Sequence, residues 1–281
     1  MLIAQITDTH LGFTERSCGN IERLERVIVA VAQHDPALVL VTGDLTENGD
    51  PEAYRLLRRM LQPFAGRVLL TVGNHDRRDA FFEAFGDVAP QSSFAQTADA
   101  RGPLRVVMLD TLDEGWETAG FCVERAAWLD ACLTQQAGQP TLIALHHPPA
   151  RTGVDWIDVN ADGRWSARLS AVVSRHPQVV GLIAGHVHQP VATSFAGRPL
   201  LIAPPVALPV AYDMRPTNPE VPDGRALIVS RRPGFALHRW TGEVLVSYFG
   251  IADDAPPVVL FNHETQAMVT QLFAEATTHD I

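Results

Sequence analysis

The sequence predicts an α/β fold in which a mostly parallel sheet is covered by helices. Six short apolar runs have the length and composition of buried strands. Helical patterns separate most of these runs, and this strand–helix–strand order is typical of parallel sheets with helices on their faces. The six predicted strands are Leu2–Ile6, Ala37–Val41, Val68–Val72, Leu104–Leu109, Thr141–Leu145 and Val179–Ala184.

Helices are predicted between these strands. Apolar side chains from Ile21 to Val31 follow helical spacing. Asp50, Pro51 and Glu52 have the chemistry of an N-cap, a first-turn proline and a first-turn acid, so a second helix is expected to begin there. Further helices are predicted over Asp79–Phe85, Glu124–Gln136 and Trp165–His176.

The composition changes after His188, where prolines become frequent. The remaining apolar runs alternate or pair locally, which favours hairpins over further strand–helix–strand units. We expect them to complete a second sheet or to form a small β-hairpin cap. The predicted hairpin strands are Arg225–Ser230 and Gly234–Arg239, joined around Arg232-Pro233, and then Glu243–Tyr248.

The C-terminal segment from Ala255 predicts an extended arm with a short helix near Gln266–Ala276. The expected organisation therefore has three parts. A core occupies residues 1–195, a cap with the second-sheet hairpins occupies 196–250, and the arm occupies 251–281.

Composition excludes several classes of function. The net charge of −10 disfavours a nucleic-acid backbone as a partner. All 22 basic residues are arginine, so no lysine is present to bind a nucleotide phosphate, form a Schiff base or act as a base. No apolar run is long enough to span a membrane, and the N-terminus has no signal-peptide pattern. Three cysteines are too few for a disulfide framework, so we expect a cytoplasmic protein.

Residues of the metal-ligand type follow five of the six predicted strands directly. Because parallel strands bring their carboxyl ends to one edge of a sheet, we expect these residues to lie together. In extended backbone, residues two apart project to the same side, so Asp8 with His10, and likewise His186 with His188, are expected to converge. The motifs are Asp8-x-His10, Gly43-Asp44, Gly73-Asn74-His75-Asp76, His146-His147-Pro148 and Gly185-His186-x-His188.

Each motif alone has an ordinary structural explanation. An Asp-x-His or Gly-Asp pair is usually a cap or a turn, and a histidine beside an apolar strand is usually a hydrogen-bonded core residue. Their joint placement favours a metal site, because six of the eleven histidines fall inside the motifs. The other five (His34, His176, His238, His263 and His279) follow no such pattern and are expected to be structural or solvated.

The ordered set of motifs resembles the calcineurin-like metallophosphoesterases. The segments that extend the resemblance to the branch of class III cyclic-nucleotide phosphodiesterases and glycerophosphodiesterases are Met1–Ala4, Asp50–Tyr54 and Trp240–Tyr248. The resemblance covers roughly residues 1–250. It implies a two-sheet αββα sandwich with two metal ions, and hydrolysis of a small phosphodiester by a metal-bridging hydroxide.

The resemblance also implies roles for individual residues. Asp8, His10 and His188 would hold one metal, Asn74, His146 and His186 the other, and Asp44 would bridge them. His147 would not be a ligand, and His75 would be the catalytic residue that faces the substrate. Asn74, His75 and Tyr212 are the expected substrate contacts. Nitrogen and oxygen ligands of this kind suit manganese, iron, cobalt or zinc.

Several alternatives stay open. Members of the glycerophosphodiesterase branch tend to have a histidine about where this chain has Leu208, and residues 203–212 are mostly apolar. This departure leaves the identity of the substrate open. The expected substrate is a small phosphodiester of the cyclic nucleotide or glycerophosphodiester type, with a phosphomonoesterase or broad phosphoesterase as the alternative activity. A metal-free binding scaffold is a third possibility, and the net charge argues against a nuclease.

The apolar cap residues Val206, Ala207, Leu208 and Val210 predict contact with a second subunit, and thus a homo-oligomer.

Overall fold

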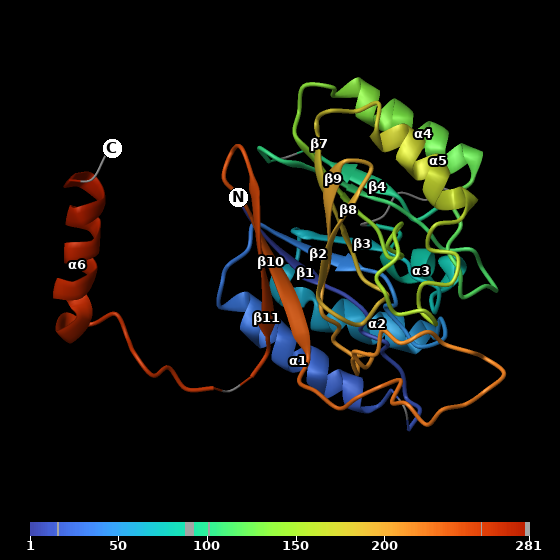
Figure 1. The fold of residues 1–281 in the computed structure, drawn as a ribbon, viewed down its shortest axis with the longest axis horizontal. Helices are drawn as coiled ribbons and strands as arrows, with labels where there is room; N and C mark the ends of the chain where they lie inside the picture. Colours follow the sequence, from blue (N-terminus) through green and yellow to red (C-terminus); the bar gives the residue numbers. More distant parts are fainter. Residues whose placement is uncertain (16, 88–92, 101, 254, 279–281) are drawn as a thin grey trace.

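The chain forms two β-sheets packed face to face, with helices on both outer faces (Figure 1). This computed structural model describes residues 1–15, 17–87, 93–100, 102–253 and 255–278. The arrangement confirms the predicted αββα sandwich. All six predicted strands are present, to within one residue at each end.

The first sheet has five strands in the order β11-β10-β1-β2-β3. Strand β1 lies between β2, which is parallel to it, and β10, which is antiparallel. The register pairs Ala4 with Val39 on one side and with Leu237 on the other. The strands are β1 (Leu2–Ile6), β2 (Leu38–Thr42), β3 (Val68–Thr71), β10 (Gly234–Trp240) and β11 (Leu245–Ile251).

The second sheet has six strands in the order β4-β5-β6-β7-β9-β8. Its centre is parallel, and a strand antiparallel to its neighbour closes each edge. The strands are β4 (Thr97–Asp99), β5 (Arg105–Met108), β6 (Thr141–Ala144), β7 (Val179–Ala184), β8 (Val191–Phe195) and β9 (Arg198–Ile202).

Helices cover the outer face of each sheet. The predicted N-cap of α2 is confirmed, since the Asp50 side chain accepts a hydrogen bond from the backbone N–H of Glu52 at 2.8 Å. Side chains from α1, α2 and α3 pack on the first sheet, and those from α4 and α5 pack on the second. The helices are α1 (Gly19–Ala32), α2 (Pro51–Met60), the 3-10 helix η1 (Gln62–Phe64), α3 (Arg78–Phe85), α4 (Val123–Gln135) and α5 (Arg164–Val173).

A third apolar layer lies between the two sheets. Strand residues alternate between this layer and the helix-covered face, so Ile3 and Leu40 face the second sheet while Ala4 and Val41 face the helices. Burial on both faces explains why the strands read as nearly continuous apolar runs. The layered packing fixes the carboxyl ends of the parallel strands at one end of the sandwich.

The predicted hairpin between Arg225–Ser230 and Gly234–Arg239 is wrong. Strand β10 pairs with β1 and β11, and residues 225–230 contribute one isolated bridge, between Val210 and Ile228. The segment lies against residues 209–216 instead. The Arg225 guanidinium donates to the carbonyl oxygens of Arg215 and Pro216 at 2.8 and 2.9 Å, and the backbone N–H of Val229 donates to the carbonyl of Pro209 at 2.9 Å.

Strands β8 and β9 were not predicted. They form a hairpin whose turn residues Ala196 and Gly197 have φ values of 49° and 73°, typical of the tight turns that join antiparallel strands. Pro199 interrupts the β-type pattern of the second strand, which hides it in the sequence. The second sheet thus continues past residue 195, where the core was expected to end. The division into domains stays a prediction.

The apolar cap surface that predicted a subunit contact is mostly buried within the chain itself. Val206, Ala207 and Val210 are at most 5% exposed, and only Leu208 is appreciably exposed, at 39%. The premise for a subunit contact at this segment is therefore wrong.

The C-terminal arm carries a helix that stands apart from the sandwich. Figure 1 shows α6 (His263–Thr278) at the end of an extended segment that follows β11. The predicted arm and helix are present. Among the described residues, no helix has both the length and the apolar character required to cross a bilayer.

Candidate metal centre

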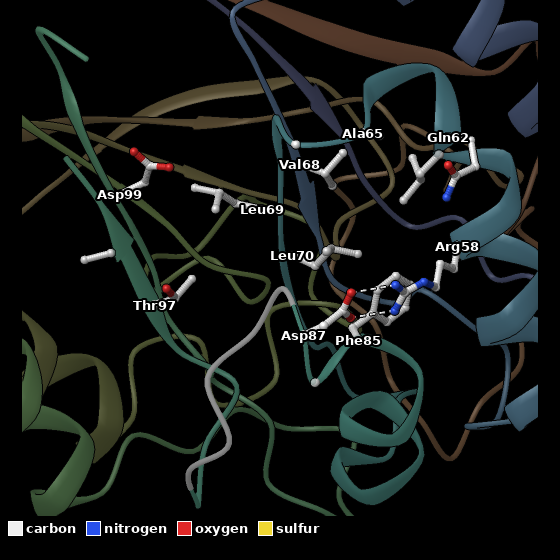
Figure 2. Close-up of a pocket in the computed structure, with 14 residues that line it drawn as sticks. Arg58, Gln62, Ala65, Val68, Leu69, Leu70, Phe85, Asp87, Thr97 and Asp99 are labelled. Atoms are coloured by element: carbon white, nitrogen blue, oxygen red, sulfur yellow. Dashed lines mark hydrogen bonds and ion pairs between the residues drawn. The ribbon is translucent and has the colours of Figure 1, made fainter. Parts of the chain in front are cut away.

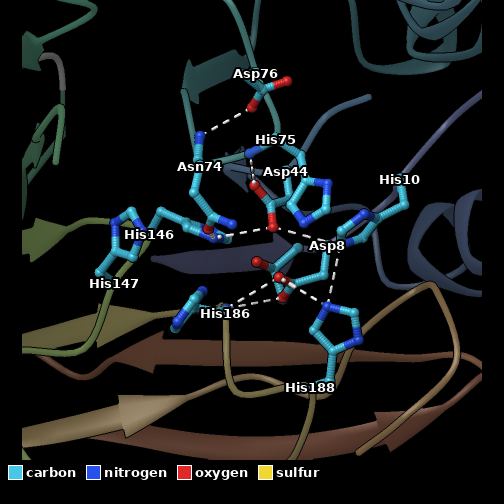
Figure 3. Close-up of polar contacts among 12 residues, drawn as sticks. Asp8, His10, Asp44, Asn74, His75, Asp76, His146, His147, His186 and His188 are labelled. Carbon is cyan, nitrogen blue, oxygen red and sulfur yellow. Dashed lines mark hydrogen bonds and ion pairs between the residues drawn. The ribbon is translucent and has the colours of Figure 1, made fainter. Parts of the chain in front are cut away.

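The predicted ligands come together at the carboxyl ends of β1, β2, β3, β6 and β7 (Figure 3). Oδ2 of Asp44 lies 3.4 Å from Nε2 of His10 and 3.2 Å from Nε2 of His146. Oδ1 of Asp8 lies 3.4 Å from Nε2 of His188. The Asp44 carboxylate therefore stands between the two halves of the predicted ligand set.

Three of the histidines have their outer ring nitrogen fixed by an oxygen acceptor. Carbonyl and carboxylate oxygens accept hydrogen bonds, so in the neutral ring Nδ1 carries the proton and the lone pair of Nε2 points to the centre. This is the arrangement that orients metal-binding histidines. The pairs are His10 with Oε2 of Glu47 at 2.9 Å, His146 with the carbonyl of Thr42 at 2.9 Å, and His188 with the carbonyl of Leu208 at 2.8 Å.

The backbone at the centre is left-handed at five predicted ligand positions. Non-glycine residues rarely adopt positive φ, and clusters of them are typical of functional sites. The expectation that extended backbone brings Asp8 and His10 together is therefore wrong, and the same holds for His186 and His188. The φ values are 52° at Asp8, 41° at His10, 47° at Asp44, 71° at His186 and 53° at His188.

Two glycines make room for this packing. A Cβ atom on Gly73 would lie 2.2 Å from Oδ1 of Asp44, so only glycine allows the third strand to end this close to that carboxylate. Gly43 has a φ of 89°, and a Cβ atom there would lie 2.5 Å from Nδ1 of His146. The glycines of these motifs thus allow the backbone to turn and also allow the side chains of Asp44 and His146 to lie against it.

Asn74 and His75 face the cavity from the end of β3. Oδ1 of Asn74 lies 3.2 Å from Nε2 of His146, and its Nδ2 donates to Glu117 at 2.7 Å. The backbone N–H of His75 donates to Oδ1 of Asp44 at 3.0 Å, and its ring Nδ1 lies 2.9 Å from the carbonyl of Glu47. The remaining ring nitrogen of His75, Nε2, lies 3.9 Å from Oε2 of Glu117.

Asp76 completes the same turn as a structural residue. Its buried carboxylate accepts hydrogen bonds from the backbone N–H groups of Leu45, Thr46 and Gly73 and from the hydroxyl of Tyr54. Burial raises the pKa of Asp76 to about 6, and the nearby Asp44 carboxylate acts in the same direction. These contacts hold the loops after β2 and β3 against each other.

His147 is buried beside the centre. Its Nδ1 lies 2.8 Å from Oγ1 of Thr111, and its Nε2 has no hydrogen-bond partner among the described residues. One ring nitrogen each of His146, His147 and His186 can be chosen so that all three lie within 4.8 Å of one another. Burial, aided by His186, holds the pKa of His147 well below its usual range, so the ring is neutral. Its exclusion from the ligand set stays a prediction.

The electrostatics suit a cationic occupant. Burial raises the pKa of Asp8, but the lowering by His188 and His146 is larger than this rise, so the pKa is about 2. Burial lowers the pKa of His146, but Asp44 and Asp8 raise it, to about 9. In both cases an opposite charge outweighs desolvation, so the buried carboxylates favour positive charge among them. Carboxylate oxygens and imidazole nitrogens are ligands for divalent transition metals.

A cavity of about 410 Å³ opens above these residues. Its lining includes both polar and apolar side chains. Tyr212 does not line it, and its ring lies 4.7 Å from the Arg231 guanidinium, so its role as a substrate contact stays a prediction. The lining residues are His10, Asp44, Asn74, His75, Glu117, Thr118, Trp156, Ile157, Val159, His186, His188, Val210 and Ile228.

A larger cavity of about 590 Å³ lies elsewhere, at the edges of β3 and β4 (Figure 2). It contains none of the predicted site residues. The Arg58 guanidinium there donates to both carboxylate oxygens of Asp87 at 2.6 Å. The convergence of ligand-type residues favours the smaller cavity as the functional site.

Sequence patterns did not identify Glu47, Glu117 and the Leu208 carbonyl as parts of the centre. Glu47 lies only three residues after Asp44, so its proximity is a signal that could have found it. Glu117 lies in a loop far along the chain from Asn74, and a backbone carbonyl carries no sequence signal. These contacts depend on tertiary packing.

Comparison with known proteins agrees with the geometry. Residues 1–190 match the model of the calcineurin-like phosphoesterase family. The chain belongs to this family. A probable cyclic nucleotide phosphodiesterase of Rhodopseudomonas palustris is 35% identical over 227 residues, which cover 76% of this chain and 81% of that protein.

Two further comparisons concern one sequence relative and one solved structure. The probable glycerophosphodiester phosphodiesterase GpdQ of Arcobacter nitrofigilis is 28% identical over 252 residues, covering 86% of this chain and 90% of the relative. The crystal structure of a dimetal phosphatase from Danio rerio has a TM-score of 0.62 at 16% identity, covering 90% of this chain and 96% of that one. At this identity the structural likeness concerns the fold.

Proposed function

We propose that this phosphoesterase hydrolyses a small phosphodiester, of the cyclic nucleotide or glycerophosphodiester type, with two divalent transition metal ions at the centre. The observation that carries the proposal is the inward orientation of Nε2 on His10, His146 and His188 around two buried carboxylates. The names of the relatives supply the substrate class. When bound, such ions lower the pKa of coordinated water and stabilise negative charge on phosphoryl oxygens.

The ligand set follows the two halves of the site. Asp44 would contact both ions, since its carboxylate lies between His10 and His146. The first ion would be held by Asp8, His10 and His188, and the second by Asn74, His146 and His186. Manganese, iron, cobalt and zinc all suit this set.

His75 is the proposed proton donor to the leaving oxygen. Its Nδ1 lies 2.9 Å from the Glu47 carbonyl, which leaves Nε2 for the cavity. Asn74 lines the same cavity, so both residues are placed to contact a bound phosphate. A positioned general acid typically contributes about 10²–10⁴-fold to the rate.

The test is a substrate panel on protein reconstituted separately with each metal. It should contain cyclic nucleotides, glycerophosphodiesters, methyl p-nitrophenyl phosphate and p-nitrophenyl phosphate. We expect metal-dependent hydrolysis of diesters at a higher kcat/KM than that of the monoester. A preference for the monoester would favour a phosphomonoesterase, and absence of metal from the purified protein would favour a binding scaffold.

We also propose a homo-oligomer and a cytoplasmic location. With the cap residues buried, the exposed apolar side chains of the arm are the better support for association, among them Phe261, Leu272 and Phe273. Sedimentation of the intact protein and of the Leu272→Asp and Leu208→Asp variants tests this. A monomeric intact protein would refute the homo-oligomer. If only Leu208→Asp dissociated the oligomer, the subunit contact would lie at the cap segment and not at the arm.

A further inference from the structure

Glu117 lies at the mouth of the cavity, in the loop between β5 and α4. Its Oε2 accepts the hydrogen bond from Nδ2 of Asn74 at 2.7 Å and lies 3.9 Å from Nε2 of His75. The side chain is 84% exposed, so it contributes little to packing. Its contacts are directed at the site.

The hydrogen bond to Glu117 fixes the orientation of the Asn74 amide. The oxygen and the nitrogen of an asparagine amide differ in chemistry but little in shape, so a flipped amide fits the same space. A carboxylate accepts hydrogen bonds only, so it selects the orientation in which Nδ2 faces Glu117 and Oδ1 faces the centre. In that orientation Oδ1 lies 3.2 Å from Nε2 of His146 and presents a lone pair to a cation.

The loop that carries Glu117 is itself anchored. The buried Asp110 carboxylate pairs with the Arg78 guanidinium at 2.7 Å, and the Leu112 carbonyl accepts from Arg125 at 2.8 Å. The backbone N–H of Gly120 donates to the carbonyl of Thr111 at 3.0 Å. Glu117 is therefore presented to Asn74 from a loop tied at both ends.

Glu117 also changes the charge balance of the site. The four carboxylates of Asp8, Asp44, Glu47 and Glu117 together carry four negative charges. This is equal in size to the positive charge of two divalent ions. Among the described residues that line the cavity, none is an arginine. A phosphodiester has one negative charge and a phosphomonoester dianion has two, so a carboxylate at the mouth opposes the monoester more strongly.

We propose that Glu117 is a positioning residue that holds Asn74 with Oδ1 toward the second metal, and that its charge favours monoanionic diesters over dianionic monoesters. The inference deepens the proposed function and rests on it. It assigns the preference for diesters to a residue outside the ligand set.

The first experiment measures metal binding without turnover. Manganese is titrated calorimetrically into chelator-treated wild type, Glu117→Ala, Glu117→Gln and the control Glu114→Gln. Glu114 lies in the same loop and accepts from the Arg78 backbone, so its variant removes one charge without touching Asn74. We expect Glu117→Ala to weaken the second equivalent about 10–100-fold, the range for lost outer hydrogen bonds to metal ligands. Glutamine keeps an acceptor but can also donate to a flipped Asn74 amide, so Glu117→Gln should bind the second equivalent with an affinity between those of wild type and Glu117→Ala.

The second experiment isolates the charge. The ratio of kcat/KM for p-nitrophenyl phosphate to that for methyl p-nitrophenyl phosphate is compared in wild type, Glu117→Gln and Glu114→Gln at low and high salt. We expect Glu117→Gln to raise the ratio about two- to fivefold at low salt, the range for an exposed charge pair. The effect should shrink at high salt through screening, and Glu114→Gln should change the ratio less.

The outcomes separate this inference from the proposed function. If wild type binds manganese but Glu117→Ala binds it equally well, the positioning role is refuted alone. An unchanged monoester ratio in Glu117→Gln at low salt refutes the charge role. If wild type binds no metal and hydrolyses neither ester, the proposed function fails and this inference fails with it.

Discussion

The buried His238 should make folding stability depend on pH. It lies on β10 with its Nδ1 2.7 Å from Oγ of Ser247 and its Nε2 3.0 Å from Oε1 of Gln5. Gln5 in turn donates to Oγ1 of Thr42 and to the carbonyl of Ala184, both at 2.9 Å. This chain of hydrogen bonds links the two sheets. Burial lowers the pKa of His238 to about 4.

The size of the effect follows from that pKa. An unfolded histidine has a pKa of about 6.5, so between about pH 6.5 and pH 4 the unfolded state binds a proton that the folded state does not. The contribution of His238 to the free energy of unfolding is therefore fully present above about pH 6.5. Below that pH it falls by about 1.4 kcal/mol per pH unit. The loss reaches roughly 3 kcal/mol near pH 4.

The assay is urea unfolding of chelator-treated protein at fixed pH values between pH 7.5 and pH 5, for wild type and His238→Gln. The variant should lose stability at all pH values, but its stability should fall less steeply with acid. The gap between the two proteins should narrow by about 2 kcal/mol between pH 7 and pH 5. His34→Gln, at an exposed position, is the matched control and should run parallel to wild type. A constant gap across this range would refute the reasoning.

Three further predictions concern the site. Asp44→Ala should lose one metal equivalent along with activity, because this carboxylate faces both halves of the ligand set; elemental analysis that finds two full equivalents would contradict the bridging role. His75→Ala should keep its metals and lose about 10²–10⁴-fold in kcat, with a smaller loss for nitrophenyl than for alkyl diesters; equal losses would indicate phosphate positioning instead of acid catalysis. Tyr54→Phe removes a buried donor to Asp76, at 2.8 Å, and should lower the free energy of unfolding by about 1–3 kcal/mol; unchanged urea midpoints would show that the backbone donors suffice.

The strands that could be predicted from sequence are those buried on both faces. The run Leu38–Thr42 is wholly apolar apart from its final threonine and is buried at every position, so composition alone reveals it. Thr97–Asp99 has three residues and no fully buried one, so β4 leaves no such pattern. Arg225–Ser230 shows the opposite error, since an alternating pattern there is overridden by the hydrogen bonds of Arg225 to nearby carbonyls.

The candidate site was predictable in its residue types but not in its conformation. Motifs after parallel strands indicated that Asp8, Asp44 and His146 would meet, because sheet topology determines where strands end. The left-handed backbone at these loops depends on contacts such as the hydrogen bond from the backbone N–H of Asp8 to the carbonyl of Gly43 at 3.2 Å. Such contacts between distant segments have no local pattern.

The left-handed backbone at the proposed metal ligands lowers folding stability at the positions that the proposed function requires. Each non-glycine residue held in such a conformation costs of the order of 1–3 kcal/mol. Glycine at one of these positions, for example His188, would relieve that strain and remove a proposed ligand at once. Selection of variants for thermal stability alone would therefore tend to erase the centre.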